Sequence, residues 1–278
     1  MREIKAEVIA DAVRQLYINA NTRLPDDVGR ALYDSIGREQ GRPAVILKTL
    51  CDNVDAAREL NIPICQDTGA AVVFADIGQD VHIDGSFENA VNAGVSAAYK
   101  EGYLRASMVF DPLRRVNTGD NTPAIIHVRL TEGENIRLTV APKGFGSENM
   151  SALKMMLPGS DEWDISDYVI RVIKDAGPNA CPPMVVGVGI GGNFEQAPLL
   201  AKRALCRPLN QRNPDAAYAN LERMILSGAN ALDIGPQGFG GVTTALAVNV
   251  EFAPTHIAGL PVAVNIGCHV NRHAEVVL

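Results

Sequence analysis

Three cysteines stand in short loops far apart along the chain, and they constrain the fold more than any other feature. Cys65, Cys181 and Cys268 each lie in a loop with Pro or Gly nearby, between apolar runs. Their separations, 116 residues from 65 to 181 and 87 from 181 to 268, match no compact ferredoxin or zinc-ribbon spacing. A site that uses all three must be assembled by the fold from distant loops. Spacing alone does not choose between ligands and buried thiols.

The other two cysteines fall within helical patterns. Cys51 lies inside one such pattern and Cys206 near the end of another, where a free cysteine is usually a small buried apolar residue. Five cysteines, spread thinly, differ from the dense and even set of a secreted disulfide scaffold. We therefore expect thiols or metal ligands in a reducing compartment.

Composition excludes several classes of function. The 278 residues are 47% hydrophobic, and 25 Lys and Arg against 32 Asp and Glu give a net charge of −7 without any basic run. Nucleic acid and anionic membranes are therefore not expected partners. The N-terminal residues carry charges at helical spacing, and no window has eighteen consecutive apolar residues. These features predict a soluble, cytoplasmic protein.

Apolar periodicity predicts alternating helices and strands. The first sixty residues repeat apolar positions at helical spacing and predict a small helical bundle. Further helices are expected near 87–103, 149–157, 164–176, 195–206 and 214–227. Strands are expected at 70–75, 124–130, 136–141, 184–189, 242–251 and 260–267, with a hairpin turn at 132–135.

These elements predict a mixed α/β (α+β) fold. An N-terminal helical segment, about 1–60, is followed by two-lobed β-sheets surrounded by helices, about 61–278. No repeat, low-complexity tract or linker marks a boundary, so one domain over 1–278 is the simplest expectation.

Three thiolates suit a metal cluster with an open position. Soft sulfur ligands select iron–sulfur clusters or zinc, and a cube held by three cysteines leaves one iron without a protein ligand. Such an iron can act as a Lewis acid toward a hydroxyl group. Asp67, two residues from Cys65, and His256 are candidates for proton transfer. Alternatively Asp67 closes an Asx turn and His256 is structural.

Two further segments are candidates for anion binding. Arg105, near Arg114 and Arg115, could clamp a carboxylate, although a surface arginine is the commoner finding. The Gly144–Asn149 loop could offer backbone N–H groups, or could be only a capped helix start.

A glycine-rich run offers a dinucleotide site as an alternative. Residues 187–192 read G-x-G-x-x-G after an apolar run and before a helical one. The acidic residue expected about twenty positions later is missing from the polar segment 207–211. The loop at 235–241 lacks the Lys-Ser/Thr of a phosphate loop and is expected to be a tight connector or to face the substrate.

Six segments in the same order resemble the class I, iron–sulfur-dependent fumarate hydratase family. The resemblance runs from about residue 20 to the C-terminus and is carried by Ile64–Gly69, Val116–Thr122, Lys143–Ser151, Ala180–Pro183, Gly235–Gly238 and Gly267–His269. It implies reversible hydration of fumarate to (S)-malate and a 4Fe–4S cluster on Cys65, Cys181 and Cys268.

The resemblance also implies roles for further residues. Asp67 would be the catalytic acid and His256 would assist near the site. Gln66, Arg105 and a glycine of the loop, Gly144 or Gly146, would contact the substrate.

The same resemblance implies a partner. Single-chain members are longer, and their C-terminal domain supplies a threonine base, arginines and a lysine. This sequence stops at Leu278. We therefore expect an α subunit that forms a hetero-oligomer with a β subunit and acts on a small dicarboxylate.

Three alternatives remain. The L-tartrate dehydratase α subunit shares the cysteine loops, although Lys143–Asn149 and Arg105–Ser107 look more like the fumarase branch. A non-catalytic Fe–S protein would need neither Gln66–Asp67 nor Arg105, and a zinc-binding structural module would be colourless.

Overall fold

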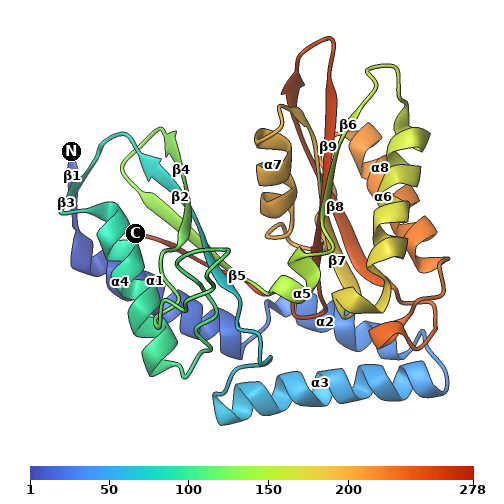
Figure 1. The fold of residues 1–278 in the computed structure, drawn as a ribbon, viewed down its shortest axis with the longest axis horizontal. Coiled ribbons are helices and arrows are strands. Elements are labelled where there is room, and N and C mark those ends of the chain that lie inside the picture. Colours follow the sequence, from blue (N-terminus) through green and yellow to red (C-terminus); the bar gives the residue numbers. More distant parts are fainter. The chain divides into compact units, whose positions relative to one another are not determined.

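The computed structural model describes residues 1–278 and confirms the mixed α/β class expected from the sequence (Figure 1). Contacts between residues divide the chain into two units. Unit 1 comprises Met1–Pro25, Val54–Phe145 and Arg272–Leu278, and unit 2 comprises Asp26–Asn53 and Gly146–Asn271. Each unit has its own four-stranded sheet, in keeping with the expected two-lobed arrangement. The single 1–278 domain stays a prediction.

Unit 1 is built on a sheet with the strand order β10-β5-β2-β4. The central strand β2 (Ala70–Gly78) pairs parallel with β4 (Ile125–Thr131) and antiparallel with β5 (Ile136–Lys143), and β10 (Ala274–Val277) pairs with β5. Ile136, Leu138 and Val140 are fully buried at every second position of β5, as expected for a strand with one face on the core.

Two helices cover this sheet. Helix α1 (Ala6–Thr22) packs on α4 (Phe87–Glu101) and on β5. A Cβ at Gly94 of α4 would collide with the carbonyl oxygen of Ala10, so a glycine allows the two helices to approach closely. A short parallel pair, β1 (Arg2–Lys5) and β3 (Val81–Asp84), completes the unit.

Unit 2 is built on a sheet with the order β6-β9-β7-β8. Strand β7 (Met184–Gly192) pairs parallel with β8 (Ala245–Thr255) and antiparallel with β9 (Leu260–Gly267), whose other edge carries β6 (Ala152–Met156). Helices α6 (Glu162–Ala176) and α8 (Ala216–Asn230) cover one face, and α7 (Gln196–Ala204) covers the other (Figure 1).

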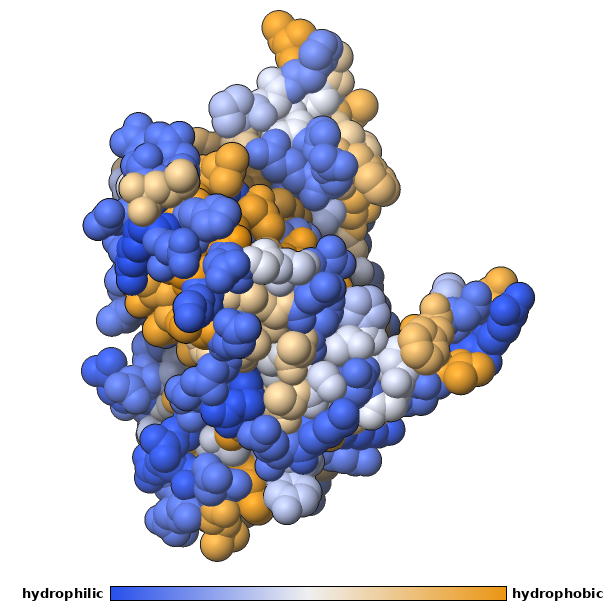
Figure 2. Space-filling model, turned by 90° about the vertical axis from the view of Figure 1, so that its left-hand side faces the viewer, coloured by the Kyte–Doolittle hydropathy of each residue, from blue (hydrophilic) through white to orange (hydrophobic).

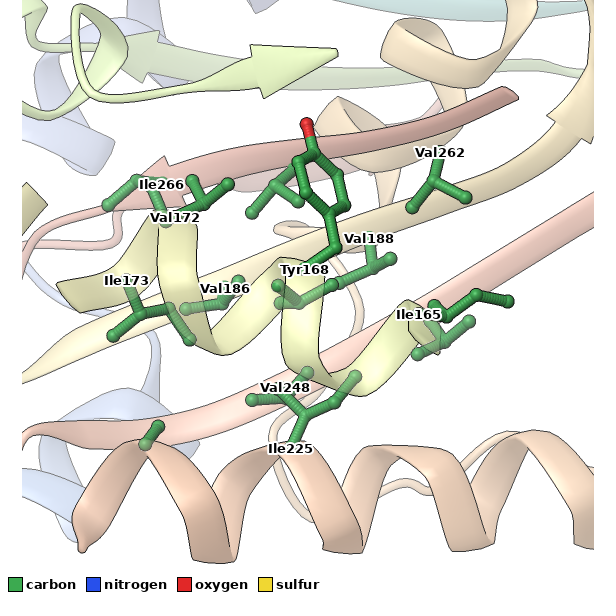
Figure 3. Close-up of a cluster of buried hydrophobic side chains, with 14 of the residues drawn as sticks. Ile165, Tyr168, Val172, Ile173, Val186, Val188, Ile225, Val248, Val262 and Ile266 are labelled. Carbon is green, nitrogen blue, oxygen red and sulfur yellow. The ribbon is translucent and has the colours of Figure 1, made fainter. Parts of the chain in front are cut away.

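The core of unit 2 lies between its sheet and the α6–α8 layer. Side chains of α6 such as Ile173 point toward the strands, and Ile225 of α8 lies beside Val248 of β8 (Figure 3). All three are fully buried. Each fully buried side chain of this size stabilises the fold by about 1.5–3 kcal/mol relative to exposure.

The glycine run that suggested a dinucleotide site has a packing role. Residues 187–192 lie within β7, whereas a dinucleotide site requires these glycines in the turn between a strand and a helix. The dinucleotide alternative is therefore wrong. A Cβ at Gly187 or Gly189 would collide with the carbonyl oxygen of Ala201 or Ala197 in α7. The glycines therefore let α7 lie directly against the strand.

Three sequence-based expectations are wrong. The expected hairpin at 132–135 does not form, because β4 and β5 lie on opposite edges of β2. The expected helix near 149–157 is instead strand β6, whose pairing with β9 overrides the helix propensity of its Leu, Lys and Met residues. The first sixty residues are mainly helical, as α1, α2 (Asp26–Ile36) and α3 (Arg42–Leu60), but they form no bundle, since α1 packs on α4 in unit 1 and α2 belongs to unit 2.

The surface is mixed in polarity. One face is mostly hydrophilic, with hydrophobic residues gathered in several groups (Figure 2). The segment after α4, which carries Arg105, exposes the large apolar side chains of Tyr103, Phe110 and Leu113. None of the helices combines the length and the apolar character that crossing a membrane requires.

Candidate active site

The loop between α3 and β2 in unit 1 holds Asp67 by its carboxylate. The backbone N–H of Gly69 donates to Oδ1 at 3.0 Å, and the N–H of Phe145 donates to Oδ2 at 2.8 Å. The first bond is the Asx turn that the sequence offered as a structural reading. The second joins two of the motifs, because it brings the Lys143–Asn149 segment to Asp67.

Two glycines make this approach possible. Gly69 has φ +84°, and a Cβ there would lie 2.6 Å from the backbone nitrogen of Lys143. A Cβ at Gly144 would lie 3.1 Å from Asp67 Oδ2. Any larger residue at either position would displace the neighbouring segment. Glycine at positions 69 and 144 therefore allows the Asp67 loop and the Lys143–Asn149 segment to approach each other this closely.

Three side chains hold the carbonyl groups of the same loop. Arg272 donates through Nη2 to the carbonyl oxygen of Asp67. The Tyr99 hydroxyl donates to the carbonyl of Gly69 at 2.6 Å, and Asn121 Nδ2 donates to that same oxygen at 3.2 Å. Burial raises the pKa of Tyr99 well above its ordinary value, so this hydroxyl remains a donor. The loop is thereby clamped through both its backbone and its carboxylate.

The segment that carries Arg105 is tied to the Asp67 loop. Thr68 Oγ1 accepts from the backbone N–H of Arg105 at 2.9 Å and donates to its carbonyl at 3.2 Å. Asn121 Oδ1 accepts from the N–H groups of Ser107 and Met108. The side chains of Gln66 and Arg105 are exposed. Unit 1 thus brings together the segments of four predicted residues, Gln66, Asp67, Arg105 and Gly144.

Sequence reasoning missed the residues that hold this arrangement. Tyr99 lies within a helix and Arg272 follows a motif, so neither carries a local signal. Asn121 belongs to the quoted Val116–Thr122 segment, where a polar residue has φ +64° and is fully buried. The resemblance to the family therefore pointed to this segment, but it assigned no role to Asn121.

Two of the three cysteine loops meet within unit 2. The backbone N–H of His269 donates to the carbonyl oxygen of Cys181 at 3.2 Å, and His269 Nδ1 lies 3.0 Å from the same oxygen. Gln237, in the 235–241 loop, donates through both its backbone N–H and Nε2 to the carbonyl of Pro182 at 2.8 Å. The Cys181, Gln237 and Cys268 segments therefore form one connected group.

The cysteines differ in exposure. Cys181 is exposed and has φ +52°, in the left-handed region that a non-glycine residue rarely adopts, whereas Cys268 and Cys65 are partly buried. Cys51 is buried, as expected from its helical position, and Cys206 is partly buried. Cys65 belongs to unit 1. No three His, Cys, Asp or Glu side chains of the structure lie close enough together to hold a metal ion.

The second half of the Lys143–Asn149 motif is anchored to β9. In the short helix α5 (Phe145–Glu148), Glu148 pairs with Lys202 of α7 at 2.5 Å and accepts from Asn265 Nδ2 at 2.9 Å. Gly146 therefore belongs to a segment of unit 2 whose place is set by α7 and β9.

His256 lies apart from the cysteine loops of its unit. It is exposed in the turn between β8 and β9, where its Nδ1 accepts from the N–H of Ala258 at 3.1 Å. Cys268 follows the opposite end of β9. A strand of eight residues spans roughly 26 Å, so unit 2 does not bring His256 and Cys268 together.

Comparisons with known proteins define the class of this chain. The model of the fumarate hydratase (Fumerase) family matches residues 10–277, nearly the whole length. The chain belongs to this family, whose enzymes are hydro-lyases.

Individual relatives agree with the family match. The chain is 40% identical over 275 residues to the putative L(+)-tartrate dehydratase subunit alpha of Methanocaldococcus jannaschii, covering 96% of both chains. It is 33% identical over 261 residues to the L(+)-tartrate dehydratase subunit alpha of Escherichia coli strain UTI89, covering 91% of this chain and 84% of the relative. The relative from E. coli strain K12 is 32% identical over 267 residues.

Proposed function

We propose that this chain is the α subunit of a two-subunit fumarate hydratase that interconverts fumarate and (S)-malate. Hydration adds a hydroxyl group to one carbon of the double bond and a proton to the other. The observation that carries the proposal is the held carboxylate of Asp67, which lies in one hydrogen-bonded network with the Arg105 segment and two residues from Cys65. An acid and a carboxylate-binding group on one network suit a charged substrate that must exchange a proton.

The cysteines have the donor chemistry that the cluster implied by the family requires. Cys181 and Cys268 lie on segments joined by the His269 hydrogen bond, and all three thiols are soft donors on loops. We propose that Cys65, Cys181 and Cys268 hold a 4Fe–4S cluster. When bound, such a cluster supplies a Lewis-acidic iron.

The protein residues then bind the substrate and move the proton. Gln66 and Arg105 contact the dicarboxylate, and a glycine, Gly144 or Gly146, leaves room for it at the backbone. Asp67 exchanges the proton with the substrate carbon at a carboxylate oxygen whose position is set by the N–H of Gly69 or Phe145. Holding both oxygens in place reduces the reorganisation that the transition state requires.

His256, unlike Asp67, is not close in the sequence to one of the proposed cluster ligands. It lies in an exposed turn at the far end of β9 from Cys268, so we propose that any part it takes in the reaction involves no contact with Cys268. A His256→Asn variant that retained full activity would remove His256 from the mechanism.

A β subunit is the proposed partner. The relatives are named as alpha subunits, which supports an assembly of two kinds of chain. We propose that the second chain supplies the remaining substrate-binding and catalytic groups, so that the isolated α chain has little activity.

L(+)-tartrate is a second candidate substrate, favoured by the names of these relatives. Its dehydration also removes a hydroxyl group from one carbon and a proton from the next, so the same residues could serve it.

Co-expression of both subunits without oxygen tests the proposal. Fumarate, L(+)-tartrate and mesaconate are compared as substrates, and Asp67→Asn is expected to lower kcat by about 10²–10⁴-fold while the brown cluster remains. Asp76→Asn, which breaks a surface pair with Arg129 in the same unit, is the matched control. A colourless protein containing zinc, or a brown one that converts none of the three substrates, would refute the proposal.

A further inference from the structure

One buried charge of unit 1 has no role in the proposed reaction. Arg272 is only 5% exposed, and its Nη2 donates to the carbonyl oxygen of Asp67. Its Nε and Nη1 are buried without a hydrogen-bond partner. By contrast, the other arginine with a buried unsatisfied nitrogen, Arg207, pairs with the carboxylates of Glu222 and Glu251.

An arrangement of this kind is unfavourable unless a hydrogen-bond acceptor completes it, and an anion does so most favourably because it also neutralises the charge. A guanidinium remains charged at all ordinary pH values and offers five N–H donors. Burying such a group without a counter-charge is costly, and natural proteins rarely leave buried donors unsatisfied. Arg272 contacts Asp67 at the main-chain oxygen and not at the carboxylate, and the nearby Tyr99 is a neutral phenol.

We propose that Arg272 binds a carboxylate group of the substrate beside Asp67. This inference rests on the proposed function. The planar guanidinium matches the two oxygens of a carboxylate, and its bond to Asp67 fixes it next to the residue that exchanges the proton. Tyr99 and Asn121 hold the adjoining carbonyl of Gly69, so the arginine contacts a loop that is itself immobilised.

The test measures binding of succinate, a four-carbon dicarboxylate that cannot be hydrated. Titration calorimetry on the anaerobically prepared two-subunit complex compares the wild type with Arg272→Gln and Arg272→Lys. We expect Arg272→Gln to raise the dissociation constant by about tenfold or more, and Arg272→Lys to give an intermediate value, because it keeps the charge and loses the planar donors. Arg129→Gln, an exposed arginine of the same unit, should leave it unchanged.

The outcomes separate this inference from the function on which it rests. If Arg272→Gln is folded by circular dichroism and binds succinate as the wild type does, the inference is wrong even if fumarate is still hydrated. If Arg272→Gln does not fold, the Arg272→Lys protein decides, since unchanged succinate affinity overturns the inference and weakened affinity supports it. If succinate binding depends on Arg272 but no substrate is converted, the proposed hydratase function is wrong and the proposed carboxylate-binding role of Arg272 is supported.

Discussion

The backbone N–H of His269 donates to the carbonyl oxygen of Cys181, 3.2 Å away, so residues 88 positions apart in the chain are neighbours in unit 2. This bond fixes the loop that follows Cys268 against the loop that begins at Cys181. The segments that carry two proposed cluster ligands, Cys181 and Cys268, are therefore joined directly through the backbone.

Removing one of these ligands should remove the cluster. We expect Cys181→Ser to lower the iron content and the visible absorbance after anaerobic reconstitution to near background, because two thiolates cannot hold a cube that requires three. Cys206→Ser, in a partly buried position outside the three loops, is the control and should retain both signals. A Cys181→Ser protein with a full complement of iron would contradict the ligand assignment.

Adding one methyl group at Gly144 should impair catalysis more than folding. In Gly144→Ala the new Cβ would lie 3.1 Å from Asp67 Oδ2, so the carboxylate or the loop must shift. We expect kcat/KM to fall by about tenfold, equivalent to about 1.4 kcal/mol, with little change in the thermal midpoint. Gly159→Ala, where nothing lies within 4 Å of the added Cβ, should be neutral in both measurements. Equal kinetics in the two variants would show that the contact has no catalytic consequence.

The glycines of β7 predict a large effect on stability. Gly189→Ala would place a Cβ against the carbonyl oxygen of Ala197, and the cost should be about 1–3 kcal/mol or more in the free energy of unfolding, measured in urea. Gly29→Ala in α2 has open space around the new Cβ and should instead stabilise by about 0.5–1 kcal/mol. If both changes had the same sign, close packing of α7 would not explain the glycine run.

Stability should fall at alkaline pH partly because of Tyr99. Burial raises the pKa of its folded-state hydroxyl, so above the unfolded-state value of about 10 the unfolded chain loses this proton first. The contribution of Tyr99 is complete below pH ~10 and is lost as the pH rises toward the folded-state value. Tyr99→Phe should lose about 0.5–1.5 kcal/mol at neutral pH and show a shallower decline above pH ~10. Parallel pH curves for the two proteins would argue against this origin.

Local pattern predicted most elements but few of the relationships between them. The unbroken apolar run predicts the strand at Ala70–Ala75, and helical periodicity predicts the helix at 164–176. Strand β6 was missed because its residues prefer helices and only the distant β9 makes them a strand. The segment 132–135 has the residues of a hairpin turn, but the sequence does not reveal that β2, which precedes it in the chain, lies between β4 and β5 in the sheet.

The candidate site divides in the same way. Asp67 could be predicted from its own loop, since Gly69 and the neighbouring cysteine make the segment unusual. The contribution of Arg272 could not, because its contact with Asp67 joins positions 205 residues apart. For His256 the sequence suggested a role near the site, whereas β9 separates it from Cys268 within the unit. Long-range pairing, which loop motifs do not encode, accounts for these differences.

The order in which unit 1 acquires its strands has a consequence for synthesis. Its edge strand β10 pairs with β5, yet the whole of residues 146–271 lies between them in the chain. During translation β5 therefore leaves the ribosome with one edge exposed, and it stays so until unit 2 has been made. At ~5–20 residues per second that interval lasts on the order of ten seconds. An unpaired strand edge is a template for pairing with other chains, so we expect nascent unit 1 to be prone to association until β10 has been made.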